Sequence, residues 1–171
     1  MKILILGSWH DEVAEQFKNE IDQLGKLLFE HNHIPVLAPG GGIYGNVGHA
    51  YRRAGGVTSV GYYPSEEARK QAGETFSFEP DEKIMTEGDY PTRNLKQVQG
   101  SDAIIAIAGR TGTATDFITG ATDYKLPCAY LRGSSKNMDL LMEFDGIKGK
   151  QNVFVGDTVE SLVNFVEQAK Q

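Results

Sequence analysis

Hydrophobic residues along the chain alternate between short unbroken runs and longer stretches with helical spacing. Residues 2–7 (KILILG) form an apolar run that ends in glycine, which is typical of a buried parallel strand. Residues 11–32 then place apolar side chains three and four positions apart, which predicts one amphipathic helix. Its inward face is expected to carry Val13, Phe17, Ile21, Leu24 and Leu28.

The same alternation continues to the C-terminus. We predict further strands within 34–42, 57–63, 102–109, 126–133 and 152–157, and helices within 46–56, 92–101, 113–125, 138–144 and 158–171. Residues 65–91 begin with a short helix and continue as an irregular insert, of the kind that forms lids or binding loops. Alternating strands and helices predict an α/β fold, a doubly wound, Rossmann-like three-layer sandwich with a mostly parallel sheet, over residues 1–171 as a single domain.

Three turns that contain glycine follow predicted strands, at residues 7–8, 40–45 and 109–112. They should share one edge of the sheet, where ligands bind near the point at which strand order reverses. Glycine lets backbone amides approach a phosphate, and a helix N-terminus favours negative charge, so two helix ends are expected to face one anion. The alternative is that the glycines only form tight turns. The predicted phosphate or nucleotide contacts are Gly7, Ser8, Gly40, Gly41, Gly42, Gly45, Gly109, Arg110, Thr111, Gly112 and Thr113.

Two charged side chains near these turns are candidates for chemistry. Asp116 follows Thr113 by three residues, so Thr113 as helix cap would give a purely structural capping box. Otherwise the Asp116 carboxylate lies at the mouth of the phosphate site, where it can stabilise a cationic sugar or position a water. Arg93 lies in the first turn of a predicted helix, which is unfavourable with the helix dipole, and its guanidinium suits phosphate. A solvated arginine is the alternative.

Composition limits the partners that the chain can have. The 171 residues carry a net charge of -6, which argues against nucleic acid or an anionic membrane but allows a small anionic ligand. The single cysteine, Cys128, has no partner for an internal disulfide. No apolar stretch is long enough to span a bilayer, and we interpret the N-terminus as a strand rather than a signal peptide. A cytoplasmic location is therefore expected.

Histidines and aromatic residues outside the turns leave two further alternatives. His31 and His33 form a near pair at a predicted helix end, where histidine is favourable without any ligand; metal binding is the weaker interpretation, and we expect no metal. Phe76 and Phe78 lie in the irregular insert. Such residues usually pin a loop to the body of a protein, and stacking on a base is the alternative.

These motifs together resemble the SLOG superfamily, and they are most similar to the Lonely guy family of phosphoribohydrolases. The segments GGGIYGNVGHAYRRAGG, TRN and SDAIIAIAGRTGTATDF carry the resemblance, which extends from the first strand to residue 133. It implies hydrolysis of the N-glycosidic bond of a nucleoside 5'-monophosphate, releasing base and ribose 5-phosphate, without a cofactor and in a homodimer. The matching positions are Ser8, Gly40, Gly41, Gly42, Gly45, Gly48, Arg93, Gly109, Gly112 and Thr113.

The chain departs from that family at four positions. Ala108, Arg110, Asn94 and Asp116 stand where the family has proline, glycine, lysine and the catalytic glutamate. The shorter carboxylate is withdrawn by one methylene, which weakens catalysis that depends on positioning. Three functions therefore stay open: a nucleotide N-glycosidase with Arg93 and Asp116 as catalytic residues, a non-catalytic nucleotide-sensing or nucleotide-binding module, and an interaction protein with purely structural glycine turns.

Overall fold

The computed structural model describes residues 1–73 and 77–169. Its centre is a seven-stranded sheet in the order β4-β3-β2-β1-β5-β6-β7, and all neighbouring strands are parallel. This confirms the doubly wound, Rossmann-like α/β fold. The strands are β1 (Lys2–Gly7), β2 (Ile34–Leu37), β3 (Val60–Tyr63), β4 (Glu82–Met85), β5 (Ala103–Ile107), β6 (Cys128–Leu131) and β7 (Val153–Gly156).

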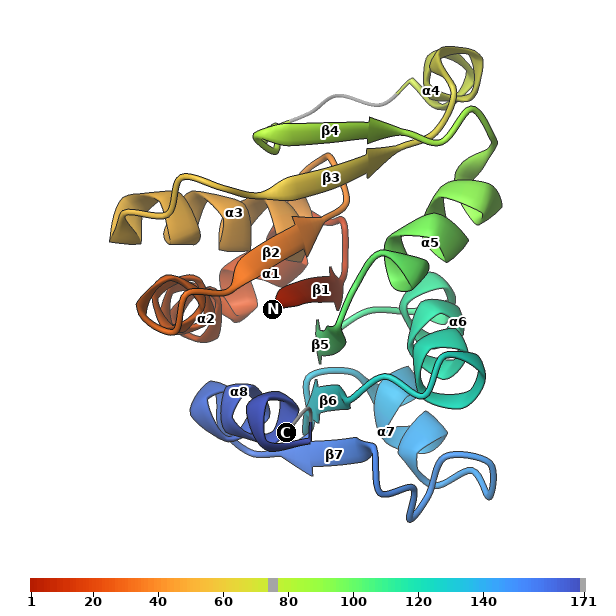
Figure 1. Ribbon diagram of the computed structural model, residues 1–171. Coiled ribbons are helices and arrows are strands. Elements are labelled where there is room, and N and C mark those ends of the chain that lie inside the picture. Colours follow the sequence, from red (N-terminus) through yellow and green to blue (C-terminus); the bar gives the residue numbers. More distant parts are fainter. Residues whose placement is uncertain (74–76, 170–171) are drawn as a thin grey trace.

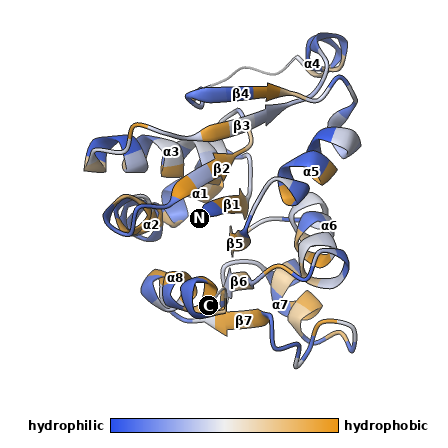
Figure 2. Ribbon diagram, viewed as in Figure 1, coloured by the Kyte–Doolittle hydropathy of each residue, from blue (hydrophilic) through white to orange (hydrophobic). Residues whose placement is uncertain are grey.

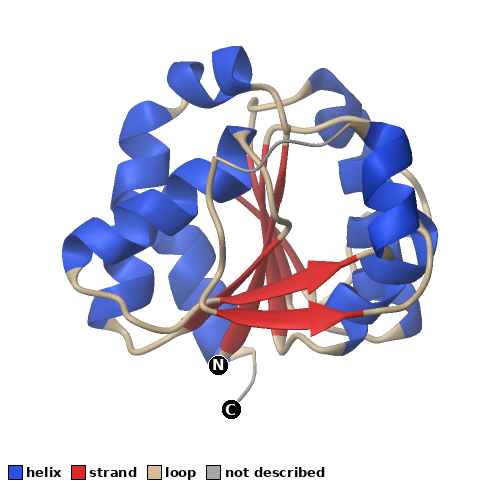
Figure 3. Cartoon of the chain, turned by 90° about the horizontal axis from the view of Figure 1, so that it is seen from above, coloured by secondary structure: helices blue, strands red, loops and turns tan. Residues whose placement is uncertain are grey.

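Helices cover both faces of the sheet, as Figures 1 and 3 show. Helices α1, α2, α3 and α8 pack on one face, and α5, α6 and α7 pack on the other. Strand order reverses between β1 and β5, which are paired side by side at the centre. The helices are α1 (Asp11–Gln16), α2 (Lys18–Glu30), α3 (Gly42–Ala54), α4 (Glu66–Ala72), α5 (Tyr90–Gln99), α6 (Thr111–Ile118), the π-helical turn η1 (Thr119–Asp123), α7 (Lys136–Met142) and α8 (Val159–Gln168).

The apolar run of β1 supplies both hydrophobic layers. Ile3 and Ile5 pack with the helices of one face, whereas Leu4 and Leu6 pack with those of the other. Successive side chains of a strand point to opposite faces, so a strand that is covered on both sides must be apolar throughout. Figure 2 shows hydrophobic residues on β2, β6 and β7, whereas the edge strand β4 is mostly hydrophilic.

Two predicted elements differ from the structure. The helix expected over residues 11–32 is divided at Phe17, which leaves the helical region with φ -117° and donates its amide to the carbonyl of Ala14. The irregular insert contains α4 and an additional strand, β4, which pairs with β3 at the sheet edge. The sequence of β4 (EKIM) is mostly exposed and lacks the apolar pattern of a central strand, because β4 is the outermost strand and pairs with β3 alone.

Within residues 1–73 and 77–169, no helix combines the length and the apolar character that crossing a bilayer requires.

Candidate functional site

A cleft of about 270 Å³ opens where strand order reverses, beyond the carboxyl ends of β1 and β5. Gly7 and Ile107 are paired at these strand ends, so the two turns that follow them leave the sheet together. An adjoining cleft of about 510 Å³ continues over the β2–α3 turn, and the two share Trp9, Ala38, Tyr44 and Arg93. The smaller cleft is also lined by Ser8, Asn94, Gln97, Arg110, Thr111, Gly112, Thr113 and Asp116.

The N-terminus of α6 forms one wall of the smaller cleft. Arg110 precedes the helix and makes no side-chain capping bond, as is also true of the residues before α1, α2 and α3, whereas hydroxyl or carboxylate groups cap α4, α5, α7 and α8. The first amides of a helix have no acceptor within the helix, so those of Thr111, Gly112 and Thr113 are directed outward. Their dipoles give this wall partial positive charge that suits an anion.

The turn before α6 is held in an uncommon backbone conformation. Ala108 has φ 59° and Gly109 has φ 111°, both in the left-handed region, which costs about 1 kcal/mol or more at the alanine. Two serines on the β6–α7 turn hold these positions. The Ala108 amide donates to the Ser134 hydroxyl at 2.8 Å, and the Ser135 hydroxyl donates to the Gly109 carbonyl at 2.7 Å. Strain held at a turn that leads into the wall of a cleft is consistent with a functional site.

Thr113 and Asp116 do not form the predicted capping box. Thr113 is the third residue of α6 rather than its cap, and its buried hydroxyl donates to the Gly7 carbonyl at 3.2 Å. This bond ties α6 to the end of β1. Asp116 lies a further turn into the helix, so its carboxylate cannot reach back to the cap amide. The capping interpretation of Asp116 is therefore wrong.

Asp116 instead belongs to a series of hydrogen-bonded side chains that begins at Arg93. The Nη1 of Arg93 donates to Gln97 Oε1 at 3.2 Å, and Gln97 Nε2 donates to Asp116 Oδ2 at 3.2 Å. Arg93 and Gln97 are four residues apart on α5, so they share one face of that helix. Burial raises the pKa of Asp116 to about 6, although the charge of Arg93 and the Gln97 hydrogen bond act in the opposite direction. Arg93 is half-buried and engaged within the site, so it is not a solvated arginine.

The glycine turn before α3 differs from the turn before α6 in how its helix begins. The Gly42 amide donates to Asp11 Oδ1 at 2.7 Å, and the Ile43 amide donates to the Ser8 carbonyl at 2.8 Å. The first two amides of α3 are therefore already used by protein acceptors, and of the two helix ends that were expected to share an anion, α6 offers the more open one. Gly40 and Gly41 line the adjoining cleft.

Other glycines of this region serve packing. A side chain at Gly42 would collide with the Ser8 carbonyl, and one at Gly45 with the Gly40 carbonyl. A side chain at Gly48 would strike the ring of Phe78, which is only 2 % exposed and lies under Arg52. Phe78 therefore pins the insert to the body and is too deeply buried to stack on a base. Phe76 lies outside the described residues.

Trp9 is a part of the site that sequence reasoning missed. It is 68 % exposed, stacks on His10 with ring centroids 4.1 Å apart, and borders both clefts. It is also the single tryptophan of the sequence. An exposed flat aromatic side chain at the rim of a cleft can stack on a heterocycle. The signal in the sequence was a bulky apolar residue placed in a turn between polar neighbours.

Fold and cleft together define a Rossmann-like protein whose α6 N-terminus, without a side-chain cap, opens into a cleft at the topological switch point. The sequence profile of the SLOG cluster4 family matches residues 1–163, and the chain belongs to that family. The resemblance to the SLOG superfamily is confirmed; the match is to cluster4 and not specifically to Lonely guy proteins.

Solved structures share the fold over nearly the whole chain. The X-ray structure of TM1055 is 24% identical, with 98% of each chain covered and a TM-score of 0.80. The molybdenum cofactor binding protein from the phototrophic bacterium Rippkaea orientalis is 19% identical, with 99% of this chain and 97% of that chain covered and a TM-score of 0.79. The Moco carrier protein from Chlamydomonas reinhardtii is 23% identical, with 99% and 98% covered and a TM-score of 0.77. A search of curated proteins found no match.

Proposed function

We propose that this protein binds a phosphorylated heterocyclic ligand, a nucleotide or the molybdenum cofactor, and holds it without cleaving it. The observation that carries the proposal is the uncapped N-terminus of α6, which faces a cleft bordered by Arg93 and Arg110. Two proteins of the same fold are named for binding or carrying the molybdenum cofactor, which supports a ligand of this class.

The cleft offers a separate partner for each part of such a ligand. The backbone amides of Thr111, Gly112 and Thr113 donate hydrogen bonds to the phosphate oxygens, and the exposed guanidinium of Arg110 adds a charge-assisted hydrogen bond. The heterocycle stacks on Trp9 at the rim. The adjoining cleft over Gly40 and Gly41 provides room for the remainder of a larger ligand.

Binding without cleavage follows from the way the candidate acid is held. In the Lonely guy interpretation, Asp116 must act as a free carboxylate beside the sugar. Here it is 7 % exposed, accepts a hydrogen bond from Gln97 and has its pKa raised to about 6 by burial. Its side chain is also one methylene shorter than the glutamate of that family. The hydrogen bond from Gln97 and the shorter side chain both weaken the stabilisation of positive charge on a ribose ring.

Because Trp9 is the single tryptophan and borders the cleft, its fluorescence reports ligand binding directly. We expect a saturable change on titration with the molybdenum cofactor or with at least one of AMP, GMP and their diphosphates, together with a higher melting temperature. Chromatography of the same mixtures should show no free base. No fluorescence or melting change with any of these ligands contradicts the binding proposal, and release of free base favours the N-glycosidase.

Two glycine substitutions separate ligand contact from folding. A methyl group at Gly112 meets no atom within 4 Å, so Gly112→Ala should fold normally while covering the α6 amides. We expect its ligand affinity to fall about tenfold or more, as when one hydrogen bond to a charged group is lost. At Gly7, the same methyl group would lie 2.6 Å from the Ile107 carbonyl oxygen. Gly7→Ala should therefore lower the free energy of unfolding by about 1–3 kcal/mol.

Chemical denaturation and fluorescence titration of both variants check this pair. Unchanged affinity in Gly112→Ala would mean that the ligand does not approach the α6 amides.

A further inference from the structure

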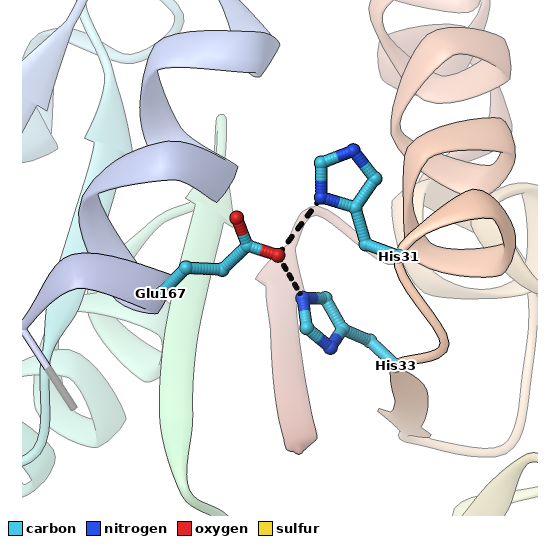
Figure 4. A group of neighbouring side chains, drawn as sticks. All are labelled: His31, His33 and Glu167. Carbon is cyan, nitrogen blue, oxygen red and sulfur yellow. Dashed lines mark hydrogen bonds and ion pairs between the residues drawn. The ribbon is translucent and has the colours of Figure 1, made fainter. Parts of the chain in front are cut away.

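A second group of polar side chains converges at the amino ends of the strands, whereas the cleft lies at their carboxyl ends. His31 directly follows α2 and His33 directly precedes β2, so both lie where β2 begins. Glu167, in the last turn of α8, points between them (Figure 4). Its Oε1 lies 2.8 Å from His31 Nδ1 and 2.8 Å from His33 Nε2.

The arrangement brings three possible metal ligands to one point from two distant parts of the chain. The three ligand atoms all lie within 4.8 Å of one another. Side-chain exposure is 7% for His33, 27% for Glu167 and 34% for His31. His33 is therefore buried, whereas His31 and Glu167 leave the group open to water on one side. Figure 4 shows His31 Nδ1, His33 Nε2 and the Glu167 carboxylate directed toward one another. Helix capping by histidine does not explain this, because capping requires no carboxylate from α8.

We propose that His31, His33 and Glu167 form a binding site for a divalent transition metal of the Zn²⁺ class, with water as the fourth ligand. Two imidazoles and a carboxylate are a donor set that zinc accepts, and an open fourth position suits a water. Bonds of about 2.0–2.2 Å in a tetrahedral arrangement separate neighbouring ligand atoms by about 3.3 Å. The two N···O distances of 2.8 Å therefore need to widen slightly, and the two nitrogens, which lie within 4.8 Å of each other, need to reach a similar separation.

Metal binding replaces the protons that now connect the three residues. Each histidine donates a ring proton to the Glu167 carboxylate in the metal-free arrangement, and when the metal binds, each proton moves to the other nitrogen of its ring. Burial lowers the pKa of His33, despite its hydrogen bond to Glu167, which favours the neutral ring that metals bind. The Nδ1 of His33 lies 3.5 Å from the amino terminus of Met1. That amino group must turn away when Nδ1 becomes the protonated nitrogen.

A bound metal would join α8 to the turn between α2 and β2. These segments are 134 residues apart in sequence, so the metal acts as a cross-link between the two ends of the fold. Since the site is rooted in the folded arrangement, metal binding is expected to raise the melting temperature. This role is independent of the ligand cleft, which shares none of the three residues.

The test uses the full chain, first stripped with a chelator and then titrated with Zn²⁺ in a calorimeter. We expect one Zn²⁺ per chain, a higher melting temperature, and tetrahedral absorption bands when Co²⁺ replaces Zn²⁺. Glu167→Gln and His31→Gln alter exposed or half-exposed side chains, so both variants should fold, and each should lose affinity by at least about tenfold. His49→Gln, at an exposed histidine on α3, should bind as the unaltered protein does.

Two results would overturn this site. One is an unaltered protein that takes up no Zn²⁺ at micromolar concentrations. The other is wild-type Zn²⁺ affinity in both Glu167→Gln and His31→Gln.

Discussion

Asp116→Asn should make the protein more stable at neutral pH, by up to about 3 kcal/mol. Burial raises the pKa of this carboxyl group from 3.8 to about 6, and each pKa unit corresponds to about 1.4 kcal/mol. Asparagine has the same shape and still accepts the hydrogen bond from Gln97, but it carries no charge that burial penalises. The pKa of about 6 already includes the attraction of Arg93 and the Gln97 hydrogen bond. The gain is an upper value because the new amide group needs a hydrogen-bond partner of its own.

The pH dependence of this gain follows from the sign of the pKa shift. A folded-state pKa above the unfolded one means that the folded protein holds the proton more tightly. Below about pH 4 the carboxyl group is protonated in both states, so it costs no stability. The cost grows as the pH rises from about 4 to 6 and is complete above that range. The advantage of Asp116→Asn should therefore be largest at pH 7 and fade toward pH 4.

Urea denaturation of the unaltered protein and the variant at several pH values measures this difference. Asp145→Asn removes one negative charge at an exposed position and serves as the matched control. Lower stability of Asp116→Asn at pH 7, or a difference that does not change with pH, would show that the buried carboxylate is not the costly group. A buried group that costs stability at neutral pH is typical of a functional site, which fits its place in the cleft.

Arg110→Glu should lower the affinity for a phosphorylated ligand by about a hundredfold or more. The lost charge-assisted hydrogen bond contributes about 1.5–3 kcal/mol, and the new carboxylate repels the phosphate. The fold should not suffer, because Arg110 is exposed and makes no capping bond. A carboxylate at this helix end is even favourable with the helix dipole, by a few tenths of a kcal/mol or more.

The control for this charge reversal is Lys148→Glu. Lys148 is exposed and precedes β7. It therefore lies toward the amino ends of the strands, whereas the cleft lies beyond their carboxyl ends. Fluorescence titration of Trp9 should show nearly unchanged affinity in Lys148→Glu and a large loss in Arg110→Glu. Equal effects of the two substitutions would indicate long-range attraction alone, and they would remove Arg110 from the site.

The fold was largely predictable because its strands are covered on both faces. The continuous apolar runs of β1 and β5 can only be buried in a two-sided sheet, and the glycine turns mark where these strands end. Strand β4 escaped prediction because a charged edge strand needs β3 beside it to be recognisable. The break at Phe17 escaped because helical spacing continues on both sides of it.

The site was predictable only in part, because several of its members are brought together by tertiary structure. The α6 turn and Arg93 follow from local motifs, and the structure places both at one cleft. Gln97 becomes relevant only when α5 packs beside α6, and Ser134 only when the β6–α7 turn reaches Ala108. The capping box failed because the observed helix begins two residues before Thr113. The homodimer and the cytoplasmic location stay predictions.

A crystal structure with the molybdenum cofactor or a nucleotide bound tests the central claim most directly. The account predicts phosphate oxygens within about 3 Å of the amide nitrogens of Thr111, Gly112 and Thr113, with a ring stacked on Trp9. A phosphate bound instead in the wide groove lined by Lys18, His49 and Arg53, with only water at the start of α6, would contradict it.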